Sequence, residues 1–415
     1  FEKMLYDNAL LVSVISEAYQ LIGNEKYRQV VAETIRFIER ELYHPDGAFL
    51  SALDADSEGV EGKFYVWTED EVNECLGADA KAFCRYYDIT ARGNWEGHSI
   101  LRVLDGAAVV AAALEMSETD LEALLQRGRE KLLKRRSSRV RPQLDDKVLL
   151  GWNALMNTAC SKAYAATGEA HYRELAVKNM EFLWKHFKAA EGGFHHTWKA
   201  GRATVPAFLD DYACLIQSLL HLQEVTGETR WLEEAGRLTE HVLTHFAEET
   251  GPFFYYTPAG QPDIIVRKKE VYDGATPSGN AVMAEDLYRL SILLDRPVWR
   301  EQAIAMILAL GQAIVRYPTS FGCWNNLLLE LVTGTAEVAI LGQGYEEIRG
   351  KILRIFSPYK VLMATSKAND TFPLLAGKTA GEPALIYVCR DYACQQPVTS
   401  SAAAISLINR GGKHN

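Results

Sequence analysis

Four segments of the chain align without gaps, and this internal repeat is the feature that most constrains its fold. The segments open at Asp7, Trp152, Asp211 and Gly279. Each carries an aromatic residue 20 positions later and a phenylalanine 22 positions after that. In chain order these residues are Tyr27, Tyr172, Trp231 and Trp299, followed by Phe49, Phe194, Phe253 and Phe321. Agreement at the same offsets in four segments indicates a repeated structural unit.

Each unit has the pattern of a helical hairpin. In the second unit Leu155, Ala159 and Ala163 follow one face of a helix, which Gly168 then ends. Glycine suits a helix end because it adopts the left-handed conformation at little cost. Tyr172 begins a second apolar stripe. The first helices are richer in Ala, Leu and Ser and the second in Lys, Glu and Arg, which predicts an inner and an outer helix.

Repeated hairpins of this kind predict an all-α dominated (α/α)6 toroid, with inner helices around a hollow and outer helices around them. A fifth hairpin is expected from residues 69–87 and 118–136, with a long excursion between its two helices. A sixth would precede Phe1, where the chain begins without Met, so a fragment of a longer protein is expected. The predicted toroid covers residues 1–331.

The pattern changes over residues 332–415. Strand-like runs at 337–341, 361–365 and 384–388 and a helical run at 345–356 predict a small C-terminal α/β segment. Gly342 and Gly344 follow the first strand, but the rest of a dinucleotide-binding turn is out of register, so an ordinary turn is expected. Since no other nucleotide, zinc or serine-hydrolase motif is present, neither a cofactor nor a metal is predicted.

Charge and cysteine usage exclude several classes of protein. The formal net charge is −10 without a long Lys/Arg run, which disfavours a nucleic-acid partner. No apolar run approaches the ~18 residues of a membrane span. The seven cysteines form no CxxC pair, and their odd number, scattered through predicted helices, indicates reduced, buried thiols in a cytoplasmic protein.

Acidic and aromatic residues gather before the predicted inner helices. Because all inner helices of such a ring point the same way, these residues are expected to share one rim. For catalysis, the candidates are Asp54, Asp56, Asp146, Asp211, Asp273 and His196. For substrate binding, they are Asp7, Asn8, Glu58, Tyr65, Trp67, Lys147, Trp152, Asn153, Tyr212, Ser278 and Asn280. Aromatic faces stack on sugar rings and carboxylates accept hydroxyl protons, so the pattern favours a carbohydrate ligand.

Each candidate has a plainer interpretation. An Asp at a helix start is commonly a cap, and for each of Asp7, Asp146 and Asp211 that role and a pocket role are equally open. The acidic loop at Asp54 does not have the spacing of an EF-hand, and a functional loop is favoured there. His195 and His196 are adjacent, so at most one faces a pocket. The outer-helix residues Trp231 and Trp299 are expected to be packing residues, whereas Trp152 sits at the rim.

Longer motifs resemble those of one known family. They are Phe1–Asn8, Ala52–Glu58, Glu61–Trp67, Asp145–Lys147, Trp152–Asn153, Val205–Tyr212 and Gly274–Asn280. The chain resembles the YyaL family, which includes the thioredoxin-domain spermatogenesis-associated proteins, over essentially its whole length. The resemblance implies a thioredoxin-like domain and the first hairpin upstream of Phe1, followed by a six-hairpin glycosidase-like toroid. That toroid is similar to those of N-acylglucosamine 2-epimerases and unsaturated glucuronyl hydrolases.

Two functions follow as hypotheses. In the first, the toroid is a carbohydrate-active enzyme: a hydrolase that uses two rim carboxylates, with Trp67, Trp152 and Tyr212 as the stacking surface, or an epimerase that moves a proton with His196. In the second, the toroid is a non-catalytic module that binds a glycan or a protein and positions the fused thioredoxin-like domain.

Overall fold

The computed structural model describes residues 1–189, 192–262 and 264–410. It divides into two compact units, the first made of residues 1–4 and 52–145, and the second of residues 5–51 and 146–415. Each unit has its own core and is described by itself.

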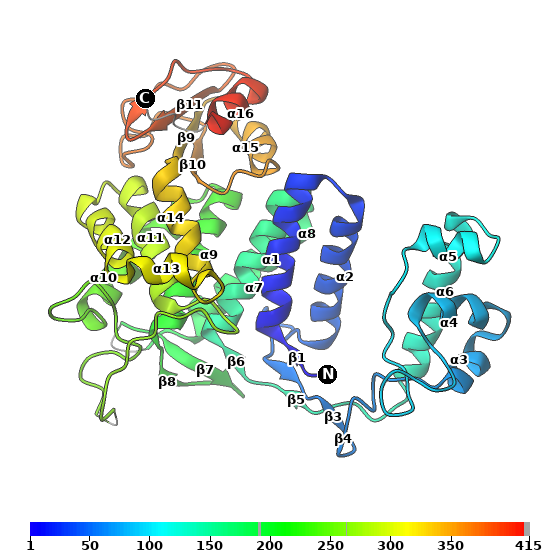
Figure 1. Ribbon diagram of the computed structural model, residues 1–415. Helices are drawn as coiled ribbons and strands as arrows, with labels where there is room; N and C mark the ends of the chain where they lie inside the picture. The colour runs from blue at the N-terminus through cyan, green and yellow to red at the C-terminus, as the bar shows by residue number, and fades with distance from the viewer. Residues whose placement is uncertain (190–191, 263, 411–415) are drawn as a thin grey trace. The chain divides into compact units, whose positions relative to one another are not determined.

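The four repeats are helical hairpins of the second unit (Figure 1). Their inner helices are α1 (Leu5–Ile22), α7 (Leu150–Thr167), α9 (Leu209–Thr226) and α11 (Gly279–Leu293). Their outer helices are α2 (Glu25–Glu41), α8 (Ala170–His186), α10 (Thr229–His245) and α12 (Pro297–Leu310). The outer-helix aromatics Trp231 and Trp299 are buried, which confirms that they are packing residues.

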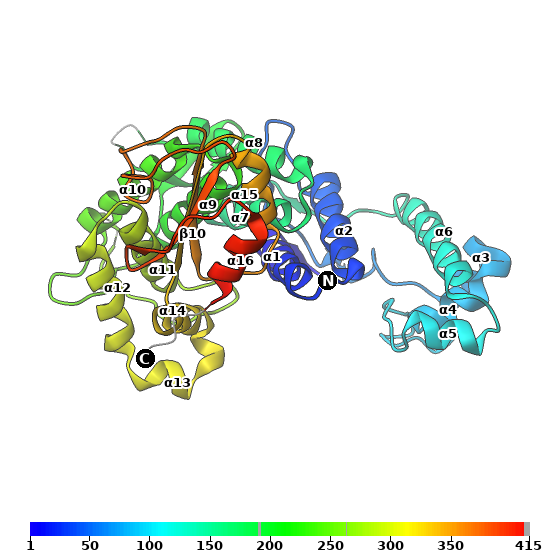
Figure 2. The same ribbon diagram turned by 90° about the horizontal axis from the view of Figure 1, so that it is seen from above.

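The inner helices pack side by side in the order α1, α7, α9 and α11, and α14 (Gly322–Thr333) lies beside α11 after the short helix α13 (Gln312–Arg316). Viewed from above, the inner helices form an arc within α2, α8, α10 and α12 (Figure 2). This arrangement confirms the α/α toroid architecture that the repeat predicts.

The backbone repeats even where the residue type does not. Gly168 and Gly227 end their inner helices in the left-handed conformation, at φ 77° and 78°. Gly23 takes φ 70° at the same position of the first hairpin, and Asp295 takes φ 50° in the fourth. Three of these four residues are glycines and the fourth is an aspartate, so the repeated feature is the left-handed turn and not the glycine.

A side chain at the start of each inner helix from α7 onwards binds the loop of the preceding hairpin. Asn153 accepts from the backbone N–H of Phe49 at 2.9 Å and donates to its carbonyl at 2.9 Å. Asn280 binds Phe254 in the same way, at 2.9 and 3.0 Å. At the equivalent position, the Tyr212 hydroxyl accepts from the N–H of Phe194 at 2.8 Å. These bonds connect successive hairpins at the N-terminal ends of the inner helices.

The first unit is a small helical module with short strand pairs. Its helices are α3 (Glu69–Leu76), α4 (Ala80–Tyr87), α5 (Ala107–Ala113) and α6 (Glu118–Arg136). Its strands are β1 (Lys3–Met4), β2 (Ala52–Leu53), β3 (Asp56–Ser57), β4 (Val60–Glu61) and β5 (Leu144–Asp145), in the orders β1-β2-β5 and β3-β4. Val72, Phe83, Val110 and Leu121 are at the centre of its core.

The expectation that residues 69–136 form a fifth hairpin between the first and second repeats is wrong. The helices α1 and α7 pack directly against each other, so no helix of this segment separates them in the arc. A turn at Gly77–Asp79 also divides residues 69–87 into two short helices. Periodicity identified helical residues here, but it does not specify which helix packs on which.

The C-terminal segment is a small α/β layer, as predicted. Its strands are β9 (Ala336–Leu341), β10 (Lys360–Thr365), β11 (Leu385–Arg390) and β12 (Ala393–Cys394), in the order β10-β9-β11-β12, with β9 and β10 parallel. The helices α15 (Tyr345–Leu353) and α16 (Ser401–Asn409) pack on this sheet. Residues 411–415 of the predicted segment lie outside the described residues.

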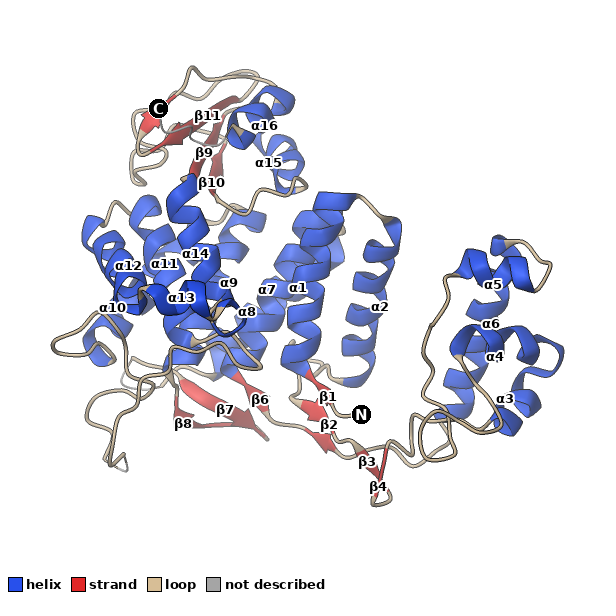
Figure 3. Ribbon diagram, in the orientation of Figure 1, coloured by secondary structure: helices blue, strands red, loops and turns tan. Residues whose placement is uncertain are grey.

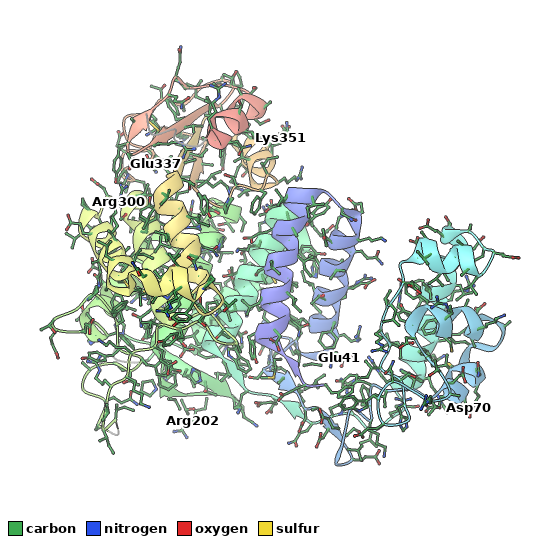
Figure 4. The ribbon with its side chains drawn as sticks, viewed as in Figure 1. Glu41, Asp70, Arg202, Arg300, Glu337 and Lys351 are labelled. Atoms are coloured by element: carbon green, nitrogen blue, oxygen red, sulfur yellow. A yellow bond between two sulfur atoms is a disulfide. The ribbon has the colours of Figure 1, made fainter. Side chains whose placement is uncertain are left out.

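One turn of this segment contacts the fourth hairpin. Arg300 of α12 forms an ion pair with Asp391 at 2.9 Å. The N–H of Tyr392 donates to the buried carboxylate of Glu337 in β9. Figure 4 labels Arg300 and Glu337. The same turn connects β11 and β12, where Cys389 lies opposite Cys394 and forms a disulfide with it. The expectation that all seven cysteines are reduced is therefore wrong for this pair, because strand register brings the two thiols together.

Over the described part of the chain, no helix combines the length and the apolar character that crossing a membrane requires.

We expect Asn153→Ala to destabilise the second unit more than Tyr212→Phe. The first change leaves the N–H and carbonyl of Phe49 without their partner inside the protein, whereas the second removes a single acceptor. The expected losses in unfolding free energy are about 3–5 kcal/mol and about 1–2 kcal/mol, respectively. Urea unfolding, monitored by circular dichroism, measures both losses in unfolding free energy. Equal losses would contradict the role of Asn153 in binding the loop of the preceding hairpin.

Candidate functional site

A small sheet lies at the N-terminal ends of the inner helices. The strands β6 (Val148–Leu149), β7 (His195–Lys199) and β8 (Arg202–Pro206) form it in that order, and β6 leads directly into α7 (Figure 3). This sheet and the first turns of α7, α9 and α11 define the rim of the second unit.

On this rim, His196 of β7 binds Asp211 in the first turn of α9. The ring nitrogen Nδ1 lies 2.8 Å from Asp211 Oδ2, which also accepts from the N–H of Phe208 at 2.9 Å. The other oxygen, Oδ1, accepts from the N–H of Gly151 at the start of α7 at 2.8 Å. Asp211 is buried, so these bonds fix both the carboxylate and the orientation of the imidazole.

The neighbouring carboxylate of Asp210 points to the next hairpin. Its Oδ1 accepts from the N–H of Gly279 at the start of α11 at 3.1 Å. A Cβ at position 279 would lie 2.2 Å from this oxygen, and one at position 151 would lie 2.9 Å from Asp211 Oδ1. Glycine at both helix starts therefore permits the close approach of the two carboxylates.

The proton affinities of His196 and Asp210 are both raised. Burial lowers the pKa of His196, but the hydrogen bond and charge of Asp211, with the charge of Asp210, raise it above its usual value. Burial, together with the charges of Asp211 and Glu270, raises the pKa of Asp210 to about 7. The rim thus holds an imidazole whose pKa is raised and a carboxyl that exchanges its proton near neutral pH.

Aromatic rings adjoin this pair. The ring of Phe208 lies 4.9 Å from that of His196 and stacks on Tyr256 at 4.9 Å with an interplanar angle of 16°. Both rings are half-buried. Such a surface suits the apolar face of a small polar ring.

The other predicted catalytic carboxylates of the second unit have different surroundings. Asp273 accepts from the N–H of Ser278 at 3.0 Å and from that of Cys323 in α14 at 2.9 Å, so both of its oxygens are engaged with backbone. Ser278 caps α11 and donates to the carbonyl of Glu270. Asp146 is half-exposed and pairs with Lys199 at 2.6 Å.

Several predicted substrate-binding residues serve as structural contacts. All donor and acceptor positions of the Asn153 amide are used, since it also donates to Leu149 and accepts from Asn179. Asn280 and Tyr212 are buried and bind backbone, as described above. Trp152 is half-buried, with its ring against that of Tyr6 at 4.9 Å. The remaining predicted substrate-binding residues of the second unit have exposed or half-buried side chains; they are Asp7, Asn8 and Lys147.

Five predicted site residues belong to the first unit. Asp54 and Asp56 are exposed, and Asp54 accepts from the Asp56 N–H in a local turn. Trp67 is only 3% exposed and has the Arg139 guanidinium 4.1 Å from its ring centroid, so it is a core residue rather than an open stacking surface. Glu58 lines a pocket of about 490 Å³ with Trp95 and His98 and pairs with Lys63 at 2.7 Å, while the Tyr65 ring is stacked on Phe1 at 6.3 Å.

Sequence reasoning chose Asp211 and His196 but not Asp210. The sequence contains a signal for Asp210, because glycine at the first turn of a helix is unfavourable unless something must approach closely. Gly151 and Gly279 are two such residues, and both mark the places where the paired carboxylates bind.

The fold and rim define an α/α toroid protein with a histidine–aspartate pair at the inner-helix starts. No family model matches the chain. The chain is similar to human Spermatogenesis-associated protein 20, with 29% identity over 99% of this chain, in agreement with the resemblance of the motifs to the spermatogenesis-associated proteins. The chain spans 58% of the length of that relative.

Two of the solved structures with some similarity to this chain are named as sugar epimerases. Cellobiose 2-epimerase from Spirochaeta thermophila is 12% identical, with 76% of this chain and 61% of that chain covered at a TM-score of 0.47. A sugar epimerase from a ruminal bacterium is 9% identical, with 74% and 60% covered at a TM-score of 0.45. The toroid assignment rests on the helix packing described above.

We expect the stability difference between Asp210→Asn and the unmodified protein to depend on pH. The folded pKa of Asp210, about 7, exceeds its ordinary value of 3.8, so the folded state holds the proton more tightly than the unfolded state. The contribution of Asp210 to stability therefore falls as pH rises from about 4 to about 7. An amide can still accept from Gly279, so the variant should gain in thermal midpoint relative to the unmodified protein across this window.

The matched control is Asp146→Asn. A hydrogen bond from Lys199 lowers the pKa of Asp146, so its contribution is present above the ordinary pKa and is lost as pH falls. Because this pair is exposed, the control should show a small change of opposite sign. A pH-independent difference for Asp210→Asn would show that the carboxyl titrates normally.

Proposed function

We propose that the second unit is a sugar isomerase or epimerase in which His196 transfers a proton at a carbon next to a carbonyl group. The observation that carries the proposal is the 2.8 Å bond from His196 Nδ1 to a buried carboxylate that is itself fixed by two backbone N–H groups. With Nδ1 bound in this way, proton exchange with a substrate goes through Nε2.

Asp210 supplies the second proton-transfer group. Its raised pKa, about 7, keeps a sizeable fraction of the carboxyl protonated at neutral pH, and the N–H of Gly279 engages only Oδ1. When His196 removes a proton from carbon, the electron pair moves to the carbonyl oxygen, where a proton from Asp210 neutralises the developing charge. Epimerisation is completed when the hydroxyl that Asp210 protonated returns its proton to Asp210 and the same carbon is protonated from the opposite face. Isomerisation is completed when the other hydroxyl of the enediol loses its proton and the former carbonyl carbon takes one up.

A glycoside hydrolase is less well supported. It needs one carboxyl to protonate the leaving group and a second carboxylate as base or nucleophile. In the second unit Asp211 and Asp273 each have both oxygens engaged by backbone N–H groups, and Asp146 pairs with Lys199 at the surface. A sugar is proposed as the substrate because the aromatic rings of Phe208 and Tyr256 form a surface beside His196.

His196→Gln should abolish proton exchange. The test is incubation with a panel of reducing aldoses and ketoses in D₂O, with the loss of the proton next to the carbonyl followed by NMR. Removal of a positioned acid–base group is expected to lower the exchange rate by about 10²–10⁴-fold. His171→Gln is the matched control, because His171 forms a similar pair with Glu39 at 2.8 Å but lies exposed on α8.

Absence of exchange with every sugar, by folded protein, would refute the enzymatic proposal. So would equal rates for His196→Gln and the unmodified chain.

A non-catalytic module is the second candidate, and one observation favours it. Asp210, Asp211 and Asp273 all bind the starts of neighbouring helices, a pattern that a purely structural rim would also have. The toroid would then bind a glycan or a protein and position the thioredoxin-like domain implied by the motifs. Thiol-dependent capture of partners by the longer protein, without sugar turnover by this chain, is the outcome expected of such a module.

A further inference from the structure

A cavity of about 270 Å³ lies on the concave side of the inner helices, away from the rim. The second halves of α1, α7, α9 and α11 contribute its wall, and α14 completes it. Residues 353–360, which connect α15 to β10, cover it. Two hydrogen bonds hold this cover in place, from Gln20 to the Leu353 carbonyl at 2.7 Å and from Arg289 to the Pro358 carbonyl at 3.0 Å.

The repeat places a titratable residue of each inner helix at an equivalent position on this cavity. Glu17, Lys162, His221 and Arg289 all stand ten positions after the residue that opens their repeat. Placing titratable groups at four equivalent, half-buried positions is costly unless they have partners or a ligand. The equivalence is also a sequence signal, because the same offset carries a titratable residue in all four repeats.

Most charges around the cavity are paired; the exceptions are Glu224, which lies 4.0 Å from His221, and Lys360, which donates to the Ser357 carbonyl. Glu17 binds Lys162 at 2.6 Å, and Arg289 binds Glu285 at 3.0 Å and Glu330 at 3.4 Å. His221 is a neutral hydrogen-bonding group, since burial and the nearby cations, Lys162 first, hold its pKa well below its usual value. A charged ligand would therefore meet side chains that are already paired with opposite charges. A neutral ligand can form hydrogen bonds with the remaining donor and acceptor positions of these side chains.

Two donors at the cavity have no partner among the described residues. The hydroxyl of Ser161 is fully buried and makes no hydrogen bond, and the Nε of Arg289 is likewise unpaired. Buried polar groups are nearly always hydrogen-bonded, so a further partner is expected at this part of the wall. The amides of Gln217 and Asn326 line the same space and can donate and accept.

We infer that this cavity binds a neutral polyhydroxylated molecule of about the size of a monosaccharide. Each hydroxyl group both donates and accepts, which matches a wall that mixes carboxylates, cations, amides and a hydroxyl. The covering segment adds the aromatic side chains of Phe356 and Tyr359. The volume lies at the small end of the range for ligand pockets, which excludes an oligosaccharide. The site lies apart from the rim and does not depend on its chemistry.

Isothermal titration of the full chain with glucose, mannose, inositol and sorbitol tests the inference, with glucosamine and gluconate as charged probes. At least one neutral probe should bind more tightly than both charged ones. Ser161→Ala should weaken that binding by about 3–10-fold, the loss expected for one hydrogen bond. The double variant Glu17→Gln with Lys162→Met removes an ion pair without leaving an orphaned charge, and should weaken it at least as much.

His171→Gln serves as the control with unchanged affinity. Three outcomes would overturn the inference: no neutral probe binds, a charged probe binds best, or the cavity variants bind normally. If the bound sugar is lost in His196→Gln but kept in both cavity variants, it occupies the rim and the cavity holds water only. This last result would leave the proposed function standing, so the two proposals fail separately.

Discussion

The arc of helices depends on hydrogen bonds between a side chain of one hairpin and the backbone of the next. Asn153, Tyr212 and Asn280 each bind the loop of the preceding hairpin. The adjacent carboxylates of Asp210 and Asp211 bind the starts of the two helices on either side of α9. A helix start has free N–H groups that need acceptors, and here the neighbouring hairpin supplies them.

The same bonds determine which rim residues can take part in chemistry. A carboxylate with both oxygens on backbone N–H groups holds the fold, and Asp211 and Asp273 are in that position. Asp211 differs because it also holds His196, so its structural role and the orientation of the imidazole come from one group. Burial, together with the neighbouring carboxylates, raises the pKa of Asp210 so that it keeps a proton near neutral pH.

Much of the fold could be predicted because the repeat is local in sequence. Helix spacing, the glycine at Gly168 and the aromatic offsets specified the hairpins, and the C-terminal strands could be recognised from their apolar runs. The packing partner of α1 could not be predicted, since an amphipathic face does not say which helix covers it. The Cys389–Cys394 disulfide depends on the register of β11 and β12, which spacing alone does not set.

The candidate site was predictable in part. Acidic residues near helix starts indicated a rim, and His196 and Asp211 do meet there. The hydrogen-bonding partner of each carboxylate was not predictable, because capping and catalysis use the same residue types at the same positions. The polar cavity was not predicted, because its four equivalent titratable residues lie within helices and not at the helix starts, where the acidic residues gather.

The hydrogen bonds between successive hairpins also affect how the arc unfolds. In linear repeat proteins, stability divides into a term for each repeat and a coupling term between neighbours, and strong coupling makes the array behave as one cooperative block. Here the coupling includes buried bonds such as that from Asn153 to Phe49, which no isolated hairpin can form. Local fraying of one hairpin would release the bonds of both its neighbours, so the arc should lose its structure in a single step rather than from one end.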